Sequence, residues 1–167
     1  MQHRLSTLTL IGLFVAAAAS AQAGERLRVI GAQGTGFIAG GSSASGAAYL
    51  RGRSVSRDGS GNATLRSGGV YRGPNGGTAV RAGQTTRSAD GTISHQSGFA
   101  AQGAGGGSVQ SSGGLTRSAA GVNQSRATTA TAANGNTYSG STSYDPQTGL
   151  SHTATCTDAA GNAIACR

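Results

Sequence analysis

Turn-forming residues recur at near-regular intervals along this chain. These turn signals are Asp-Gly and Asn-Gly pairs, two glycine clusters, Ala120-Gly121, Asp145-Pro146 with Gly149, and Gly161-Asn162. They centre near residues 59, 75, 91, 106, 121, 135, 147 and 161, at steps of 16, 16, 15, 15, 14, 12 and 14. Asp-Gly and Asn-Gly pairs adopt the positive φ angles that tight β-hairpins need. About ten residues rich in Thr, Ser and Val lie between successive turns. The spacing therefore predicts a meander of short antiparallel strands.

The segments between the turns bring their larger side chains to every second position. Four groups would each share a face in an extended chain: Leu65, Ser67, Gly69 and Tyr71; Ile93, His95, Ser97 and Phe99; Tyr138, Gly140, Thr142 and Tyr144; and Leu150, His152, Ala154 and Cys156. Helical periodicity is absent after residue 23, and glycine is too frequent for helices. We predict an all-β fold, an up-and-down antiparallel meander of about eight to nine strands over residues 46–167.

Large apolar side chains are scarce in the part of the chain that would fold. From residue 24 onward, Leu, Ile, Val and Phe occupy 17 of 144 positions, roughly 12%. A share below about 20% is typical of disordered chains, because too little apolar surface is buried to offset the loss of chain entropy. The composition predicts a thin core and leaves intrinsic disorder open as an alternative.

The first residues have the organisation of a cleavable secretory signal peptide. His3 and Arg4 form a basic start, residues 8–19 are nearly continuously apolar, and Ala21-Gln22-Ala23 is a small-x-small cleavage site. The apolar run is too short to cross a bilayer as a helix, which takes about 20 residues. We predict a signal helix over residues 1–23, cleavage after Ala23, and a periplasmic or extracellular protein with no membrane-spanning segment after cleavage.

Residues 24–45 lack the ladder of turn signals. We predict a short strand over Leu27–Ile30, followed by a flexible glycine-rich linker from Gly31 to Gly46. The run Val29–Phe37 is similar to a nucleotide-binding strand and glycine turn, but no helix pattern and no βαβ unit follow it. We therefore predict no cofactor.

The two cysteines, Cys156 and Cys166, lie near the C-terminus. In an exported chain an even pair indicates one disulfide. In a hairpin centred on Gly161, Cys156 would face Cys166 and Asp158 would face Ile164. We predict a C-terminal hairpin pinned by this disulfide, and no metal site, because four ligands are needed and too few lie nearby.

The chain is strongly basic, and every cationic residue is Arg. It has 13 Arg, five acidic residues and a net charge of +8, which becomes +7 without Arg4. Arg57, Arg87 and Arg117 each precede a turn and lie 30 residues apart, which equals two strands and two turns. Guanidinium groups bind phosphate and carboxylate in a bidentate way, so these three are candidate anion-binding residues along one edge of the meander. The alternative is that solvated arginines protect the strands from aggregation.

The sequence near the C-terminus, Tyr144-Asp145-Pro146-Gln147-Thr148-Gly149-Leu150 followed by residues 151–156, resembles a hairpin unit of the YD-repeat type. Those repeats build extended β-sheets in large bacterial surface proteins. The whole chain is similar to small secreted Gly/Ser/Thr-rich proteobacterial proteins of unassigned function. The resemblance implies a β-rich exported protein and supplies no active site.

The residues that would support catalysis are few and scattered. His95 and His152 stand alone in Thr/Ser-rich segments, no Gly-x-Ser-x-Gly elbow lies between a strand and a helix, and the four aspartates lie in or beside turns. We predict that the protein is not an enzyme and has no catalytic or metal-binding residues. The expected function is that of an exported structural, adhesive or self-associating envelope or extracellular protein, with itself as partner. The alternative is an Arg-rich module that binds lipopolysaccharide, polysaccharide or extracellular DNA.

Overall fold

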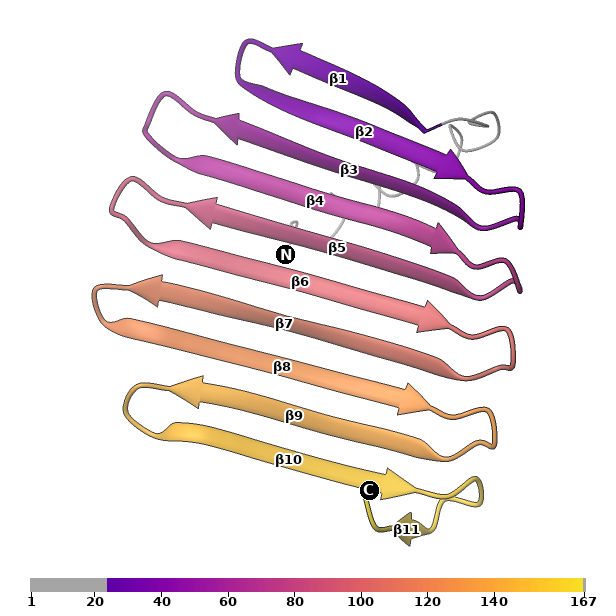
Figure 1. Ribbon diagram of the computed structural model, residues 1–167. Coiled ribbons are helices and arrows are strands. Elements are labelled where there is room, and N and C mark those ends of the chain that lie inside the picture. The colour runs from indigo at the N-terminus through magenta and orange to yellow at the C-terminus, as the bar shows by residue number, and fades with distance from the viewer. Residues whose placement is uncertain (1–23, 167) are drawn as a thin grey trace, which may run out of the picture.

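The computed structural model describes residues 24–166, so the predicted signal peptide lies outside the described residues. The described chain forms one sheet of eleven strands, and each strand pairs with its neighbours in sequence (Figure 1). All the pairings are antiparallel, which confirms the all-β, up-and-down meander. The strands are β1 (Glu25–Gly31), β2 (Gly34–Ser42), β3 (Ala48–Arg57), β4 (Ala63–Arg72), β5 (Thr78–Arg87), β6 (Ile93–Gln102), β7 (Ser108–Ser118), β8 (Gly121–Thr131), β9 (Thr137–Asp145), β10 (Gly149–Thr157) and β11 (Ala163–Ile164).

The predicted count of eight to nine strands was too low because the segment before residue 46 is also part of the sheet. β1 is longer than the short strand expected there, and β2 occupies most of the predicted linker. All nine residues of β2 pair with β3, and seven pair with β1. The glycines of β2 permit a close approach of the backbones, since a Cβ at Gly34 would meet the carbonyl of Val55. Glycine here allows close pairing and does not mark a linker.

A 15-residue unit of one strand and one turn organises the middle of the sheet. Strands β3 to β7 begin 15 residues apart. Every turn from β2–β3 onward has one glycine with positive φ, between 77° and 122°: Gly46, Gly61, Gly76, Gly91, Gly106, Gly121, Gly135, Gly149 and Gly161. In most of these turns the amide of the first residue donates to the carbonyl of the fifth, as Gly103 does to Gly107 at 2.7 Å. This is a type I turn followed by a left-handed glycine, a common hairpin connection.

The turn between β3 and β4 uses its Asp-Gly pair differently from the turn between β5 and β6. In the later turn the glycine of the pair, Gly91, has positive φ, as predicted. In the earlier turn the positive φ belongs to Gly61, and Asp58 stands at the first turn position. The Asp58 carboxylate accepts hydrogen bonds from the amides of Ser60 and Asn62 at 2.9 and 3.0 Å. This two-residue offset accounts for the first long step in the sequence pattern, from 59 to 75, because the left-handed glycines of these two turns, Gly61 and Gly76, are 15 residues apart.

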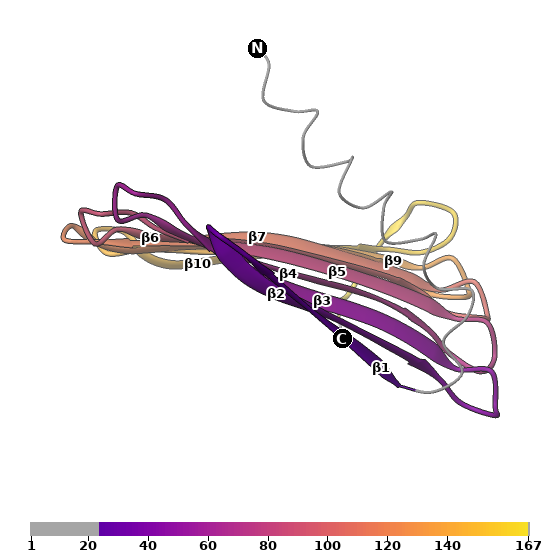
Figure 2. The same cartoon turned by 90° about the horizontal axis from the view of Figure 1, so that it is seen from above.

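The sheet is a single twisted layer with both faces open (Figure 2). Ala39 (2% exposed) and Leu50 (9% exposed) are the buried hydrophobic residues of the described chain. The predicted thin core is therefore confirmed. With so little apolar burial, hydrogen bonding between strands and side-chain pairing across strands are the main sources of order. Residues 24–166 contain no helix that is both long and apolar enough to cross a bilayer.

The predicted disulfide between Cys156 and Cys166 is present, with a Cα–Cα distance of 5.4 Å. The predicted register of this hairpin was wrong, because Cys156 lies opposite Ile164 and not opposite Cys166. The turn has five residues, Asp158 to Asn162, with the Asp158 amide donating to the Asn162 carbonyl at 2.9 Å. The chain thus uses the same wide turn as elsewhere, and Asp158 pairs with Asn162 and not with Ile164. The disulfide bridges positions that are diagonal to each other across the short β11 pairing.

Candidate binding faces of the sheet

The strand register sorts the side chains onto two chemically different faces. Residues directly opposite each other in an antiparallel pair project to the same side of a sheet. One such row runs Val55, Leu65, Thr85, His95, Leu115, Gln124, Tyr144 and Leu150. Following the rows shows that all four groups predicted to share a face within their own strand lie on the same side of the sheet. The meander therefore collects the larger side chains of these four groups on one surface, whereas aliphatic residues such as Leu50, Val70 and Val80 project from the other.

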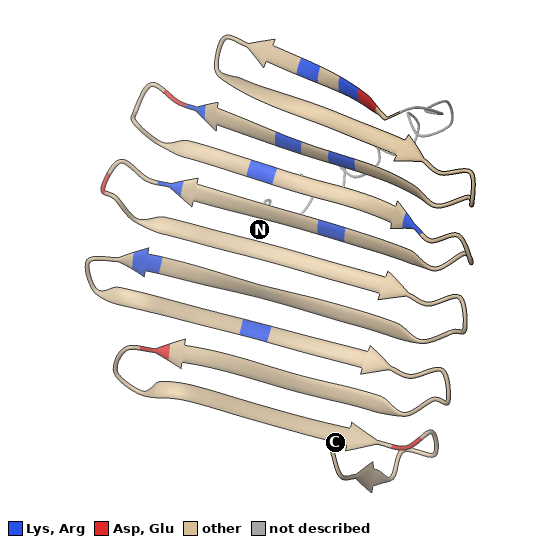
Figure 3. Ribbon diagram, in the orientation of Figure 1, with Lys and Arg blue, Asp and Glu red and all other residues tan. Residues whose placement is uncertain are grey.

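This surface, which we call the basic face, carries most of the arginines. Nine of the eleven arginines in the described chain project from it: Arg26, Arg28, Arg51, Arg53, Arg57, Arg81, Arg87, Arg117 and Arg126. Figure 3 shows that most arginines lie on β1, β3, β4 and β5, and the two on β4, Arg66 and Arg72, project from the opposite face. The two acidic residues within strands, Glu25 and Asp145, project from the opposite face, and the other three lie in turns. Within residues 24–166 the strands thus place no acidic side chain on the basic face.

The three predicted anion-binding arginines lie in one row on this face. Arg57 and Arg87 end β3 and β5, Arg117 is the last but one residue of β7, and Ala63 and Ile93 separate the three on the intervening strands. Adjacent strands lie about 4.8 Å apart, so successive arginines of the row are about 10 Å apart along the sheet. Their positions confirm the predicted common edge. Whether this row binds anions remains a prediction.

The same end of the sheet also carries negative charge, which weakens the row as an anion site. Asp58 directly follows Arg57, and Asp90 lies in the turn that follows Arg87 (Figure 3). A carboxylate one to three residues from an arginine lowers the local positive potential. The arginines farther along the strands, Arg51, Arg53 and Arg81, have no carboxylate that close in sequence, so we expect the positive potential to be stronger there.

That stronger region combines arginines with aromatic rings. Arg51 places its guanidinium carbon 5.8 Å from the ring centre of Tyr49, and Arg81 places its own 5.5 Å from that of Tyr71. Both distances are within the range of cation–π attraction. Tyr49 and Tyr71 lie directly opposite each other, and Phe99 lies opposite Arg81. The resulting cluster of Tyr49, Arg51, Tyr71, Arg81 and Phe99 spans four neighbouring strands.

Every aromatic residue of the described chain projects from the basic face. The set is Phe37, Tyr49, Tyr71, Phe99, Tyr138 and Tyr144. Four of the six are classed as exposed despite their size. Flat rings and planar guanidinium groups on one exposed surface suit a ligand that has both planar or apolar portions and negative charge.

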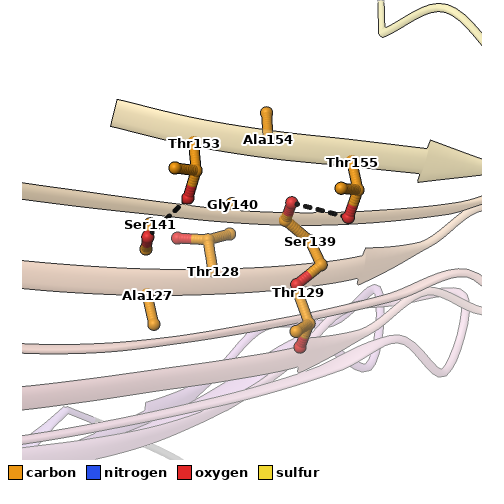
Figure 4. Close-up of a pocket in the computed structure, with 9 residues that line it drawn as sticks. All are labelled: Ala127, Thr128, Thr129, Ser139, Gly140, Ser141, Thr153, Ala154 and Thr155. Carbon is orange, nitrogen blue, oxygen red and sulfur yellow. Dashed lines mark hydrogen bonds between the residues drawn. The ribbon is translucent and has the colours of Figure 1, made fainter. Parts of the chain in front are cut away.

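The opposite surface is rich in small hydroxyl side chains, and we call it the hydroxyl face. In β8–β10 it presents Ser125, Thr129, Thr131, Thr137, Ser139, Ser141, Ser143, Ser151, Thr153, Thr155 and Thr157. A shallow, open depression on this face is lined by small residues of these three strands (Figure 4). Ser141 and Thr153 share a hydrogen bond of 2.8 Å there, and Thr155 donates to the Ser139 carbonyl at 3.4 Å. The lining has no titratable side chain, so it offers neither an acid nor a base for catalysis.

The two histidines of the described chain pair with threonines across the strands. His95 Nδ1 lies 2.8 Å from Thr85 Oγ1, and His152 Nδ1 lies 2.9 Å from Thr142 Oγ1. Each histidine thus has a polar neighbour on the sheet surface but no carboxylate to orient it, as a catalytic triad requires. In the part of the chain that the structure describes, no group of three His, Cys, Asp or Glu side chains is arranged to hold a metal ion.

Two exposed aspartates have perturbed acidity because of their turns. The side-chain amide of Asn62 donates to Asp58 at 2.8 Å and is the largest cause that lowers the pKa of this carboxyl. Asn162 lowers the pKa of Asp158 in the same way, from 3.0 Å. Both effects stabilise the charged form of a turn residue. They indicate a structural role in the hairpin turns.

Sequence reasoning selected three arginines of the basic face and missed the other six. The 30-residue spacing identified the Arg57 row, and the same spacing relates Arg51 to Arg81. Arg51, Arg53 and Arg57 also share one parity within a strand, which places them on one face. The alternation of side chains along a strand could therefore have placed Arg51 and Arg53 on the same face as Arg57. The arginines of β1 could not be found this way, because the turn that joins β1 to β2 was expected to be part of a linker.

Comparison of the chain with protein-family models, with curated proteins and with solved structures found no match.

Proposed function

We propose that this is an exported, non-enzymatic structural or adhesive protein that uses its basic face to attach to anionic polymers. Lipopolysaccharide, acidic polysaccharide and extracellular DNA are the polymers of this kind that occur in an envelope or outside a cell. The observation that carries the proposal is the segregation of nine arginines and six aromatic residues onto one face without a strand carboxylate.

The electrostatics of the basic face favour a polymer over a small ion. Arginines on alternate strands are about 10 Å apart, and the Debye length at physiological salt is about 8 Å. Each guanidinium therefore acts on its own section of a long anion, and the individual attractions add along the polymer. Arg51 and Arg81 can also contribute planar stacking surfaces beside their tyrosines.

The single-layer architecture supports a structural or adhesive role. A sheet without a second layer exposes a large binding area for its mass, and one face can attach while the other remains in solvent. The hydroxyl face presents many Ser and Thr side chains in β8–β10, together with the exposed Leu27 and Val29 of β1. Within residues 24–166, the depression on the hydroxyl face is open to solvent and has no titratable side chain, which favours binding over catalysis there.

The test is retention of the exported protein on immobilised heparin and on lipopolysaccharide as a function of salt. Replacing Arg51→Gln together with Arg81→Gln should reduce the slope of log affinity against log salt by about 1.5, because each lost ionic contact removes about 0.7–0.9. The matched control is Arg66→Gln with Arg72→Gln, which removes equal charge from the hydroxyl face and should change the slope by less than half as much.

Two results would overturn the proposal. One is no retention of the unaltered protein at about 50 mM salt, where ionic binding is strong. The other is an equal effect of the two double variants, which would mean that net charge matters and the basic face does not. A third pair, Arg57→Gln with Arg87→Gln, should have an intermediate effect because Asp58 and Asp90 lie nearby.

A further inference from the structure

We propose that copies of this protein join head to tail, with the open edge of β10 in one copy pairing with the open edge of β1 in the next. This inference rests on the edges of the sheet, whereas the proposed polymer binding rests on a face. The two proposals therefore stand or fall separately.

Both edges of the sheet have unpaired backbone groups. Within residues 24–166, β1 pairs with β2 on one side, and no other strand pairs with its outer side. β10 pairs with β9 along its full length, but β11 covers only Cys156 and Thr157 on the outer side. Residues 149–155 of β10 are therefore an open edge as well. Neither edge stretch contains proline, and the open part of β10 has no Asp, Glu, Lys or Arg, whereas β1 carries Glu25, Arg26 and Arg28, charged side chains of the kind that can oppose edge pairing.

The most exposed large hydrophobic side chains of the described chain lie on these two edges. Leu150 is 73% exposed, Ile30 69%, Leu27 62% and Val29 53%, and the interior strands have no large hydrophobic side chain as exposed as these. A large hydrophobic residue on an edge strand lacks the neighbour that would cover it on one side. A second strand placed along each edge would supply that neighbour.

The two edges match in length and direction. The open part of β10 has seven residues, 149–155, and β1 has seven, Glu25–Gly31. Strand direction alternates along the meander, so β10 of one copy and β1 of a translated copy are antiparallel (Figure 1). The pairing between copies would therefore be antiparallel, like every strand pairing within one copy.

In one register every residue of 149–155 pairs with a residue of 25–31 in the next copy, and each face of one copy continues into the same face of the next. It places Gly149 opposite Gly31 and Thr155 opposite Glu25 of the next copy. Leu150 then lies opposite Ile30, both on the basic face. The row that begins with Ile30 and ends with Leu150 within one copy would run on into the next. Beyond Thr155, β11 occupies the edge and ends the junction.

Charge favours this unlike pairing over the pairing of two β1 edges. Two β1 strands paired over their full length would bring Arg28 opposite Arg28, and like charges directly opposite each other are destabilising. The open stretch of β10 contains no Asp, Glu, Lys or Arg. A contact between unlike edges that does not close on itself extends into a filament. The expected product is a ribbon one sheet wide with one basic face.

The experiment measures sedimentation of the exported protein, from Gly24 to the C-terminus, across a concentration series. Electron microscopy then examines the largest species. Two variants each block one edge: Ile30→Lys on β1 and Leu150→Lys on β10. Each should be a monomer, or need at least about tenfold more protein for half assembly. Mixing them should give dimers, because each variant retains the edge that the other needs. Val80→Lys, an exposed aliphatic on interior strand β5, is the matched control and should assemble normally.

The outcomes separate this proposal from its competitors. Monomers of the unaltered protein at all concentrations would overturn it, as would assembly that survives in either blocked variant, which would mean that identical edges or faces associate. If a lysine variant loses its β-type circular dichroism, Ile30→Thr and Leu150→Thr replace it, with the same expectations. Heparin retention of the monomeric variants tests the proposed polymer binding independently of assembly.

Discussion

The turn between β6 and β7 allows the backbone requirement for glycine to be measured in isolation. Gly105 and Gly106 are adjacent, and a Cβ added to either one meets no atom within 4 Å. They differ in conformation, because Gly106 has a φ of +92° and Gly105 has no positive φ. Replacing each by alanine therefore compares two changes with equal space and unequal backbone strain.

The expected magnitude follows from that difference. Alanine in the left-handed region costs about 1–2 kcal/mol, and alanine in place of glycine restricts the unfolded chain by the same amount at both positions. The unfolded-state effect cancels between the two variants. Gly106→Ala should thus be less stable than Gly105→Ala by about 1–2 kcal/mol, and Gly105→Ala should be neutral or slightly stabilising.

Amide hydrogen exchange resolved along the chain is the suitable assay. Each hairpin contacts only its neighbours, so the loss should be local to β6 and β7, as in other arrays of repeated units. Protection there should fall about 5- to 30-fold in Gly106→Ala relative to Gly105→Ala. Equal protection in the two variants would refute the assignment of the left-handed glycine. A uniform loss over all eleven strands would refute the claim that the hairpins are energetically local.

Three further predictions concern the two ends of the chain. Because the pKa of Asp158 is lowered in the folded state, its contribution is present above the unfolded value of about 3.9 and is lost as the pH falls through the folded value. Amide exchange of the last turn should therefore accelerate in that acidic range more than exchange elsewhere in the sheet. Asn162→Ala should remove this selective acceleration, because it removes the hydrogen bond that lowers the pKa of Asp158. Cys166→Ser should release β11 and lengthen the open edge of β10, seen as loss of protection at Cys156 without loss in β3–β7. Mass spectrometry of the exported protein should give Gly24 as its first residue; retention of residues 1–23 would contradict the predicted signal peptide.

The sequence by itself determined the local features of this fold. Turn spacing and the alternation of larger side chains were sufficient for the all-β meander, because both are written within about fifteen consecutive residues. Scarcity of large apolar residues predicted the thin core, and the cysteine pair predicted the disulfide. The errors, too, were local: the linker that is β2, the position of the left-handed glycine beside Asp58, and the register of the last hairpin. In each of these three segments, the sequence offers more than one glycine or turn residue that could occupy the turn position.

Only the tertiary structure decided which side chains lie together. A shift of one residue in any pairing moves a whole strand to the opposite face, so parity within one strand does not fix its relation to the next. The observed registers bring nine arginines and six aromatic residues to one side, and they leave Ile30 and Leu150 on two open edges. These relations join residues more than one hundred positions apart. They arise from the summed lengths of every intervening strand and turn, which no single motif in the sequence specifies.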